Sequence, residues 1–572
     1  MLELKLVLLL LLSVFPEGLA APSQVPVQLP ESQIKPHKLQ GRFLHITDIH
    51  PDPHYRDGGS EKSACHRKKQ KKAKRRGGYY GLPYSSKCDS PFSLSNFTLD
   101  FLDKEWSSEI DFVIWTGDSA RHDNDRKRPR TTAEIYELNR ILSNKMETVF
   151  SSKGIPVVPS IGNNDVWPHN IMMPGPNSVT SEFSSIWRSF VPFESYQVFQ
   201  RGGYFSVEVI PNAVAAISLN TMYFYDSNKA VGGCEYANPE DPGNLQFDWL
   251  EVQLETFRER GMQTVISGHV PPSSYNFFPE CYVRYVNLSL KYQDTILGHF
   301  FGHMNADHFF FLEANDLSNE PRRTNDTDSD KVGTLKKRKA LYNGLLQDFS
   351  ELPKSSQNTN HGDYGVVNVS PSVVPNPYLP SFRIFTYNTT GTPYHPGHFG
   401  DEDREQLVTG GGDSLLTAQR LRDGEAAGCD ERGNNSTQAC RSRNWHSSPQ
   451  SPSRSNRLWT LLGYAQYYLP KLENSDEKRR PKYKLEYMTY PVAKLHPPEA
   501  ASEAKFHYPI PLKQLPRSLR NATIKESKFA PYGMADLTIP SWLELARRLG
   551  DSAETKLRKR FKKYMYMGAG GE

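Results

Sequence analysis

The sequence has little that would suit a membrane channel, a nucleotide-driven machine or a cysteine-bound zinc site. Beyond its first 15 residues it contains no long apolar run, its mean hydropathy is −0.62, and only 37% of its 572 residues are hydrophobic. A phosphate-binding loop of the form G-x-x-x-x-G-K-[ST] is absent, which argues against nucleotide-driven work. No C-x-x-C pair occurs among its six cysteines, so we do not expect these cysteines to bind zinc. No internal repeat is evident.

Residues 1–21 are predicted to be a secretory signal. The apolar stretch Leu6–Phe15 is too short to span a hydrocarbon core, which takes about 20 residues, and the small residues Gly18, Ala20 and Ala21 follow it. We expect cleavage near Ala21. The alternative is an uncleaved N-terminal anchor that associates the protein with a membrane.

Cysteines and glycosylation sequons indicate the same secretory route. Six cysteines fit an oxidising compartment, and 15 pairings of them are possible. The most local arrangement joins Cys65 to Cys88, Cys234 to Cys281 and Cys429 to Cys440. N-x-[ST] sequons begin at Asn96, Asn287, Asn325, Asn368, Asn388, Asn434, Asn435 and Asn521.

Five short polar blocks each follow an apolar run typical of a strand. The runs are Phe43–Ile46, Phe112–Trp115, Val157–Ile161, Thr264–Ile266 and Thr295–Leu297. The blocks are Asp48-Ile49-His50, Gly117-Asp118, Gly162-Asn163-Asn164-Asp165, Gly268-His269 and Gly302-His303-Met304-Asn305. Because such blocks stand at the carboxyl ends of strands, we expect them to gather at one edge of a sheet.

The residue types of these blocks suit a two-metal phosphoesterase. Carboxylate, imidazole and amide oxygens bind hard or borderline divalent cations. Two such cations about 3.5–4 Å apart clamp a phosphoryl group and lower the pKa of a water between them, and one carboxylate must bridge the pair. Asp118 is the natural bridge, because it stands alone after a glycine that permits a sharp turn. Asp48 and His50, two positions apart, would point to one face of a strand.

The blocks resemble the calcineurin-like metallophosphoesterase superfamily, whose pattern reads D-x-H, G-D, G-N-H-[DE], G-H and G-H-x-H. Longer stretches are similar to the fungal vacuolar endopolyphosphatases, in the acid-sphingomyelinase-like branch. These stretches are D-I-H-P-D-P-H-Y at Asp48–Tyr55, W-T-G-D-S-A-R-H-D-N-D at Trp115–Asp125 and G-N-N-D-V-W-P-H-N at Gly162–Asn170. The similarity runs from about Gly41 to Leu549.

The resemblance implies an α/β fold, namely a metallophosphoesterase β-sandwich flanked by helices (αββα) with polar surface insertions. It implies two divalent metal ions per chain (Zn, Mn, Mg, Co or Fe, with the identity open). The ligands that it implies are Asp48, His50, Asp118, Asn163, His269, His303 and Asn305. The implied activity is cleavage of internal phosphoanhydride bonds of inorganic polyphosphate, with some terminal cleavage, in the vacuole lumen or, alternatively, at the vacuolar membrane or outside the cell.

Two positions depart from the superfamily pattern. Asn164 stands where most members have a histidine that acts as general acid or contacts the transition state, and Asn305 stands where the last histidine would bind metal. An amide is a poor proton donor, but polyphosphate has phosphate as its leaving group and needs protonation less. We expect His122 to contact the scissile phosphate, with His54 and His169 as weaker candidates.

The domain organisation expected from these features is one catalytic core, residues 41–310, interrupted and extended by polar segments. Residues 311–360 and 401–456 are expected to be flexible insertions, residues 361–400 to hold strands that complete the core, and residues 457–572 to form a C-terminal extension with a basic tail. The strands Tyr364–Ser370 and Ser381–Tyr387 are expected in the second sheet. The segments Trp542–Leu549 and Lys556–Tyr564 are of helical type.

Two other functions compete with polyphosphate cleavage. One is a phosphodiesterase acting on sphingomyelin-like lipids or on nucleotides, although only about 28 residues separate the signal from Asp48 and leave no room for a lipid-activator domain. The other is a non-enzymatic binding protein on this scaffold, which the intact ligand set argues against. No nucleic acid partner is required, and self-association into a homo-oligomer remains open.

Overall fold

The computed structural model describes residues 39–68, 75–318, 335–396, 445–496 and 509–567. The chain divides into a short N-terminal unit, Met1–Leu39, and one compact unit, Gln40–Glu572, to which every element below belongs. Among the described residues, none of the helices combines the length and the hydrophobicity that spanning a bilayer requires. Several predictions fall outside these ranges, namely the signal 1–21, the Cys429–Cys440 pair, and the sequons at Asn325, Asn434 and Asn435.

The first of two mixed sheets carries the N-terminal strands. Its members are β1 (Arg42–Ile46), β2 (Phe112–Trp115), β3 (Val157–Pro159), β10 (Ser381–Tyr387), β11 (Leu461–Tyr468) and β12 (Lys484–Met488), in the order β12-β11-β10-β1-β2-β3. Strands β1, β2 and β3 are parallel, whereas β10, β11 and β12 pair antiparallel. Every residue of β1 and β2 is buried, as expected for parallel strands covered on both faces.

The second sheet holds the middle of the chain. Its members are β4 (Phe205–Ile210), β5 (Val214–Ser218), β6 (Gln263–Ser267), β7 (Ile296–Phe301), β8 (His308–Glu313) and β9 (Tyr364–Val369), in the order β4-β5-β6-β7-β9-β8. Strands β5, β6, β7 and β9 are parallel, and β4 and β8 are antiparallel edges. In both sheets, therefore, the metal-type blocks follow strands that run in one direction.

The two sheets pack face to face through aromatic side chains. Phe300 of β7 lies edge-on to Phe43 of β1 and to Phe385 of β10, with ring centroids 5.4 and 5.0 Å apart. Phe43 in turn stacks on Phe385 at 5.0 Å. Buried aromatic rings each remove about 150–250 Å² from water and dominate core energetics. This contact confirms the predicted sandwich and holds the strand ends of both sheets at a common edge.

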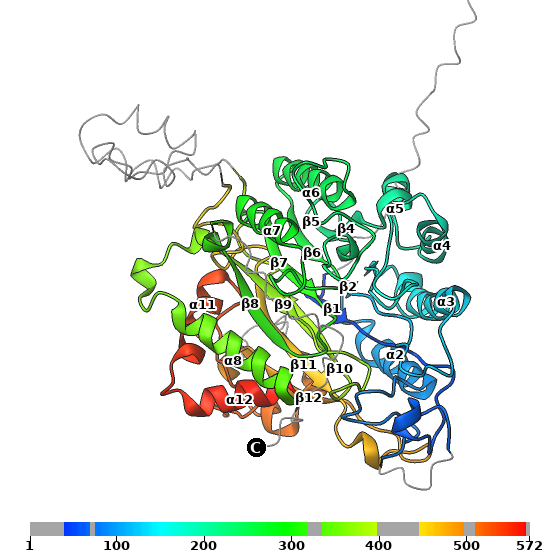
Figure 1. Ribbon diagram of the computed structural model, residues 1–572. Coiled ribbons are helices and arrows are strands. Elements are labelled where there is room, and N and C mark those ends of the chain that lie inside the picture. Colours follow the sequence, from blue (N-terminus) through cyan, green and yellow to red (C-terminus); the bar gives the residue numbers. More distant parts are fainter. Residues whose placement is uncertain (1–38, 69–74, 319–334, 397–444, 497–508, 568–572) are drawn as a thin grey trace, which may run out of the picture. The chain divides into compact units, whose positions relative to one another are not determined.

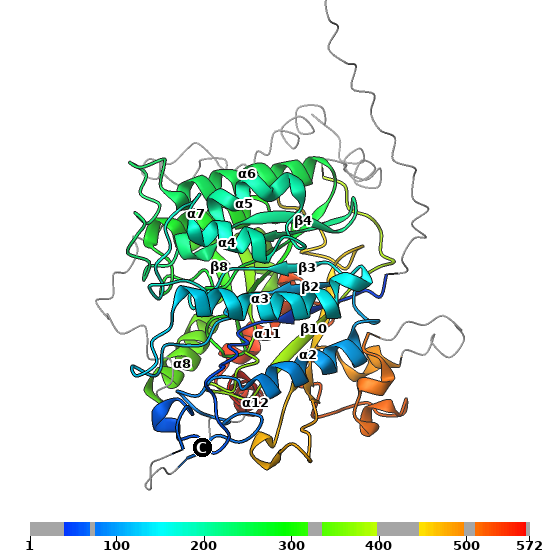
Figure 2. The same ribbon diagram turned by 90° about the vertical axis from the view of Figure 1, so that its right-hand side faces the viewer.

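Helices surround the two sheets (Figures 1 and 2). They are α2 (Phe92–Trp106), α3 (Thr132–Val149), α4 (Ser178–Ile186), α5 (Tyr196–Gly202), α6 (Pro242–Glu259), α7 (Pro279–Lys291), α8 (Leu335–Glu351), α11 (Ile539–Gly550) and α12 (Thr555–Met565). Trp106 of α2 packs on Tyr467 of β11, with centroids 5.3 Å apart, whereas α6 and α7 lie against the second sheet. The helices α11 and α12 match the two C-terminal segments predicted as helical.

Three helices that follow the five polar blocks in sequence cover the β8 edge of the second sheet. The ring of Phe309 in β8 lies 5.0 Å from Phe349 of α8, 4.4 Å from Trp542 of α11 and 6.1 Å from Phe561 of α12. The segment 311–360, expected to be a flexible insertion, thus contains a helix whose residues Leu345 and Phe349 are buried. Apolar residues spaced four apart on one face account for this packing.

The strands after residue 361 are divided between the two sheets differently from the prediction. Strand β9 joins the second sheet as expected, but β10 belongs to the first sheet, where it pairs antiparallel with β1. Strands β11 and β12, from the expected C-terminal extension 457–572, continue that first sheet. Alternation of apolar and polar residues indicates a strand, but it does not indicate which strand will be its neighbour.

Two disulfides are present in the described part of the chain, one between two loops and one between a loop and the first turn of α7. The Cα atoms of Cys65 and Cys88 are 5.4 Å apart and those of Cys234 and Cys281 are 5.2 Å apart, so two of the three local pairings are present. Among the described sequons, Asn96, Asn287 and Asn521 are exposed and Asn388 is half-buried. The side chain of Asn368, by contrast, is buried on β9, so the folded chain has no room for a glycan there.

Candidate metal centre

The structure brings the five polar blocks together at the carboxyl ends of β1, β2, β3, β6 and β7. A hydrogen bond joins the two sheets at this point, because His269 Nδ1, after β6, donates to the carbonyl of Thr116, after β2, at 2.7 Å. The backbone N–H of Asp48 donates to the carbonyl of Gly117 at 3.0 Å, and that of His50 donates to the carbonyl of Asp118 at 3.2 Å. The block backbones are therefore mutually fixed.

A first group of possible ligands consists of Asp48, His50 and Asp118. Their side chains are buried, and His50 Nε2 lies 3.3 Å from Asp118 Oδ2 and 3.5 Å from Asp48 Oδ1. His50 Nδ1 donates to the carbonyl of Ala120 at 2.6 Å, which leaves Nε2 as the ligand atom. Nε2 itself makes no hydrogen bond in the described structure. A buried imidazole nitrogen that faces two carboxylates without a hydrogen bond fits a divalent cation.

A second group surrounds the side-chain oxygen of Asn163. That Oδ1 lies 2.9 Å from His269 Nε2 and 2.9 Å from His303 Nδ1. His269 Nε2 is also 3.3 Å from Asp118 Oδ2, the oxygen that faces His50 in the first group. One oxygen of Asp118 thus stands between both groups, as a carboxylate that bridges two ions must. The donor set of imidazole, amide and carboxylate atoms fits divalent metal binding.

The electrostatics of the centre favour positive charge. Burial by itself lowers the pKa values of His50 and His269, but the charge of Asp118, the hydrogen bonds to it and the other nearby carboxylates together outweigh burial and raise both pKa values, that of His269 to about 9. Burial and the charge of His269 lower the pKa of His303 to about 4, which keeps its imidazole neutral. The carboxylates therefore attract cations, and a bound metal ion supplies this charge while the imidazoles bind it as neutral bases.

Asn305 supplies a further free oxygen. Its Nδ2 donates to the carbonyl of Asn376 at 2.9 Å, whereas its buried Oδ1 has no hydrogen-bond partner among the described residues. Hydrogen bonding of the nitrogen leaves the oxygen available as a ligand, and a buried oxygen without a partner costs about 1–3 kcal/mol. Asn305 therefore fits a metal-binding role better than a purely structural one.

The backbone of the blocks is strained. Positive φ angles are uncommon for residues other than glycine and cost about 1–3 kcal/mol each. Five of the seven predicted ligands have them: Asp48 (49°), His50 (43°), Asp118 (55°), His303 (68°) and Asn305 (55°). Strain of this kind persists where the surrounding structure imposes it, and it gathers at functional sites.

Asp165 anchors the loop that carries Asp118, a role that the sequence did not reveal. Its carboxylate accepts the backbone N–H groups of Asp118, Ser119, Ala120 and Gly162, and the side-chain amide of Asn139, at 2.8–3.1 Å. Burial and the neighbouring Asp118 raise the pKa of Asp165 to about 6, while its hydrogen bonds lower it. The only signal for this role in the sequence is that Asp165 stands at the end of the third polar block.

The histidines predicted to contact substrate take different places. The ring of His122 stacks on that of His50 with centroids 4.0 Å apart, and its side chain is 24% exposed. His169 Nε2 lies 3.0 Å from Asn163 Nδ2. His54 instead lies near Arg128 and Glu134, at 3.3 and 3.7 Å. His122 and His169 therefore contact the centre.

Asp89 orients His122 and was not predicted. Its Oδ1 lies 2.8 Å from His122 Nδ1, and its Oδ2 accepts the backbone N–H of His122 at 2.7 Å. Burial raises the pKa of Asp89, but the charges and hydrogen bonds of His122, together with His50, outweigh burial and lower it to about 2. The Asp89 carboxylate therefore fixes the imidazole through Nδ1 and leaves Nε2 toward solvent or substrate.

Asn164 contacts the shared carboxylate directly. Its backbone N–H donates to Asp118 Oδ1 and its side-chain amide to Asp118 Oδ2, both at 2.8 Å. The amide thus lies beside the oxygen common to both groups of possible ligands. At this position a side chain is close enough to the candidate metal centre to influence a substrate bound there, although an amide is a poor proton donor.

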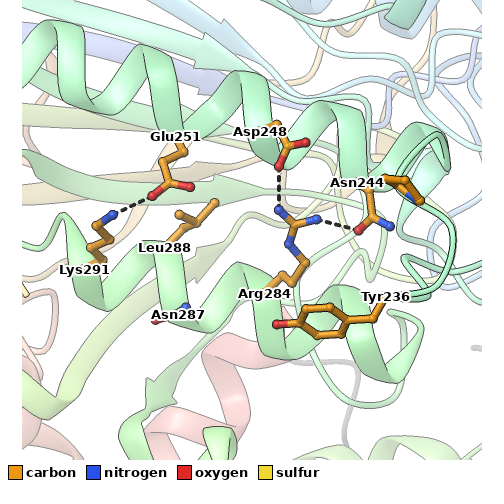
Figure 3. Close-up of a pocket in the computed structure, with 9 residues that line it drawn as sticks. Tyr236, Asn244, Asp248, Glu251, Arg284, Asn287, Leu288 and Lys291 are labelled. Carbon is orange, nitrogen blue, oxygen red and sulfur yellow. Dashed lines mark hydrogen bonds and ion pairs between the residues drawn. The ribbon is translucent and has the colours of Figure 1, made fainter. Parts of the chain in front are cut away.

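A separate cavity of about 340 Å³ lies between α6 and α7 and contains none of the predicted ligands (Figure 3). Ion pairs span it, from Arg284 to Asp248 at 2.8 Å and from Lys291 to Glu251 at 2.5 Å. Because these charges are paired with one another, the cavity does not resemble a site for phosphate chemistry. Asn287 lines it, so a glycan on this sequon would lie over the groove.

Comparisons with known proteins agree with this fold. Residues 41–305 match the family described as calcineurin-like phosphoesterase, so the chain is a metal-dependent phosphoesterase in class. An endopolyphosphatase of Cryptococcus neoformans is 39% identical, with 96% of this chain and 95% of the relative covered. An endopolyphosphatase of Schizosaccharomyces pombe is 32% identical, with 89% and 83% covered. The chain belongs to the endopolyphosphatase family of calcineurin-like hydrolases.

Solved structures add a more distant likeness. A dimetal phosphatase from Danio rerio aligns with 60% of this chain and 92% of its own length, at 12% identity and a TM-score of 0.30.

Proposed function

We propose that this chain cleaves internal phosphoanhydride bonds of inorganic polyphosphate, with some cleavage at chain ends, by a two-metal mechanism. The observation that carries the proposal is the single Asp118 oxygen between two groups of possible ligands, 3.3 Å from His50 on one side and 3.3 Å from His269 on the other. The names of the relatives supply the substrate class.

The residues of the centre have distinct roles in this proposal. Asp48, His50 and Asn305 would hold one divalent ion, Asn163, His269 and His303 would hold the other, and Asp118 would bridge them. When bound, such a pair lowers the pKa of water and stabilises charge on phosphoryl oxygens. Asp165 holds the Asp118 loop in place, and Asp89 holds His122, whose half-buried side chain contacts a phosphate of the substrate.

A substrate comparison tests the proposal. Purified full-length protein is loaded in turn with Zn, Mn, Mg, Co or Fe. Each sample is incubated separately with long-chain polyphosphate, with a nucleotide phosphodiester and with sphingomyelin. We expect polyphosphate to shorten with products of intermediate length, which distinguishes internal from terminal cleavage. Faster hydrolysis of a diester than of polyphosphate would support the phosphodiesterase alternative, and no hydrolysis with any metal would support a binding protein.

Residue 164 provides a test of substrate class. If the phosphate leaving group needs little protonation, Asn164→His should raise kcat/KM on an alkyl phosphodiester at least about tenfold more than on polyphosphate, because a general acid contributes roughly 10²–10⁴-fold when the leaving group is poor. The measurement is kcat/KM of the Asn164→His protein and of the unaltered protein on each of the two substrates. His122→Ala serves as comparison and should lower both activities. Equal changes on both substrates in Asn164→His would show that residue 164 does not set substrate class.

The location of the protein forms a second part of the proposal. The N-terminal segment and the exposed sequons Asn96, Asn287 and Asn521 favour a secretory route to the vacuole lumen. We expect mass spectrometry of the protein purified from its own cells to show a start near Ala21 and glycans on exposed sequons, with none on Asn368. An intact Met1 without any glycan would place the protein outside this route, whereas an intact Met1 with glycans would indicate the uncleaved anchor.

A further inference from the structure

Arg130 is a buried cation with unused hydrogen-bond donors beside the metal centre. It lies just before α3, and its side chain is 3% exposed. Nη1 donates to the carbonyl of Arg121 at 2.9 Å and to that of Asn164 at 2.6 Å. Nε and Nη2 are buried and have no hydrogen-bond partner within the described ranges.

Such an arrangement is costly unless something binds there. A guanidinium has five N–H donors and stays charged at all relevant pH values. Burying a charged donor without a partner costs more than the roughly 1–3 kcal/mol of a neutral one. A buried guanidinium with two free nitrogens therefore points to an anionic ligand that completes its hydrogen bonds.

The neighbours of Arg130 place its guanidinium beside Asn164 and the candidate metal centre. Asn164, whose carbonyl Arg130 binds, donates its own N–H and amide to Asp118 at 2.8 Å. Among nearby carboxylates, Asp118 is the one that acts most strongly to raise the pKa of Arg130 against the lowering effect of burial. The guanidinium carbon also lies 5.5 Å from the ring centre of Trp167, a cation–π contact that helps to hold the side chain.

The geometry points to a phosphoryl-binding subsite formed by Arg130, in which Nε and Nη2 donate to oxygens of the phosphate that leaves during anhydride cleavage. This inference rests on the proposed function and deepens it. The planar fork of a guanidinium matches two phosphate oxygens. Arg130 would supply positive charge next to residue 164, where the resembled superfamily has an imidazole and this chain has an amide.

The corresponding reaction step is balanced without a proton donor. A water that has lost a proton to solvent attacks phosphorus and forms the new P–O bond. The bond from phosphorus to the bridging oxygen breaks, and its electron pair goes to the leaving phosphate. Arg130 donates two hydrogen bonds to that phosphate and keeps all of its protons, so it stabilises the developing negative charge rather than neutralising it.

Variants of Arg130 test this subsite in the full-length, metal-loaded protein. Removal of a positioned donor to a transition-state oxyanion lowers kcat by roughly 10²–10³-fold. We expect Arg130→Gln to lose about this much of kcat on polyphosphate, with unchanged metal content and Tm, and to bind orthovanadate at least about tenfold more weakly. Arg130→Lys keeps the charge but not the fork and should lie between. The matched control is Arg126→Gln, an exposed arginine of the same loop, which should behave as the unaltered protein.

The readouts separate this inference from the proposed function. Orthovanadate affinity, measured by calorimetry, depends on the anion subsite and not on the natural substrate. If polyphosphate proves not to be the substrate but Arg130→Gln still weakens orthovanadate, the proposed function fails and the subsite stands. Two results would show that Arg130 serves only to hold the loops of Arg121 and Asn164. One is an unchanged orthovanadate affinity in Arg130→Gln, and the other is a loss of bound metal that parallels the loss of activity in both Arg130 variants. If Arg130→Gln does not fold, Arg130→Lys alone decides, since it should weaken orthovanadate at least threefold.

Discussion

Asp118→Asn is expected to lower kcat/KM on polyphosphate by at least about 1,000-fold, a loss of roughly 4 kcal/mol of transition-state stabilisation. The physical reason is the position of Asp118 Oδ2 between His50 and His269. An amide in its place carries no charge, so two cations at a separation of about 4 Å would repel each other with less compensation. Metal content per chain, measured by elemental analysis, should fall together with activity.

The matched control for this experiment is Asp248→Asn. Asp248 is an exposed carboxylate on α6 that pairs with Arg284 and is not among the predicted ligands. We expect its replacement to leave both metal content and kcat/KM within about twofold, as for other exposed ion pairs. Wild-type activity in Asp118→Asn would contradict the assignment of the centre, and an equal loss in both variants would point to a general effect on folding.

Asp165→Ala is expected to destabilise the protein by about 3–5 kcal/mol and to empty the centre of metal. Its carboxylate accepts four backbone N–H groups and one side-chain amide, and it is fully buried. Removal leaves these donors without an acceptor and releases the Asp118 loop from its strained backbone conformation. Denaturant unfolding of the metal-free protein measures the first effect, and metal titration measures the second.

A conservative variant and a surface control sharpen the test of Asp165. Asp165→Asn keeps one acceptor oxygen, so it should lose less stability than the alanine variant but still bind metal more weakly. Glu147→Ala removes an exposed carboxylate from α3 and should change the free energy of unfolding by less than about 0.5 kcal/mol. A stable Asp165→Ala protein that binds metal normally would show that other contacts hold the Asp118 loop.

The position of Asn164 and the free donors of Arg130 suit the same chemistry. A chain that keeps the metal-ligand types but has an amide in place of an imidazole can still lower the barrier if positive charge lies nearby. The hydrogen bond from Arg130 to the carbonyl of Asn164 brings such a charge to that position. The variants at positions 164 and 130 therefore test one idea, namely that stabilisation of the leaving group's negative charge replaces proton transfer to it. Asn164→His adds a proton donor, and Arg130→Gln removes the positive charge.

Local sequence by itself determined the centre to a large extent. Each block follows an apolar run that becomes a buried strand, and Gly117 with a φ of 85° makes the turn that the pattern suggested. The family and the sandwich were also predictable, because the resemblance rests on motifs that occur in a fixed order along the chain. The two disulfides were predictable because each joins cysteines that are close in sequence.

Only the tertiary structure decided which distant residues support the centre. Asp89 precedes His122 by 33 positions and Arg130 precedes Asn164 by 34, yet each pair is joined by a hydrogen bond. Strand β10 was expected in the second sheet. It instead pairs with β1, which precedes it by more than 330 residues. Periodicity reports which face of an element is buried, whereas contacts between separate segments arise from packing the whole chain, and no local pattern records them.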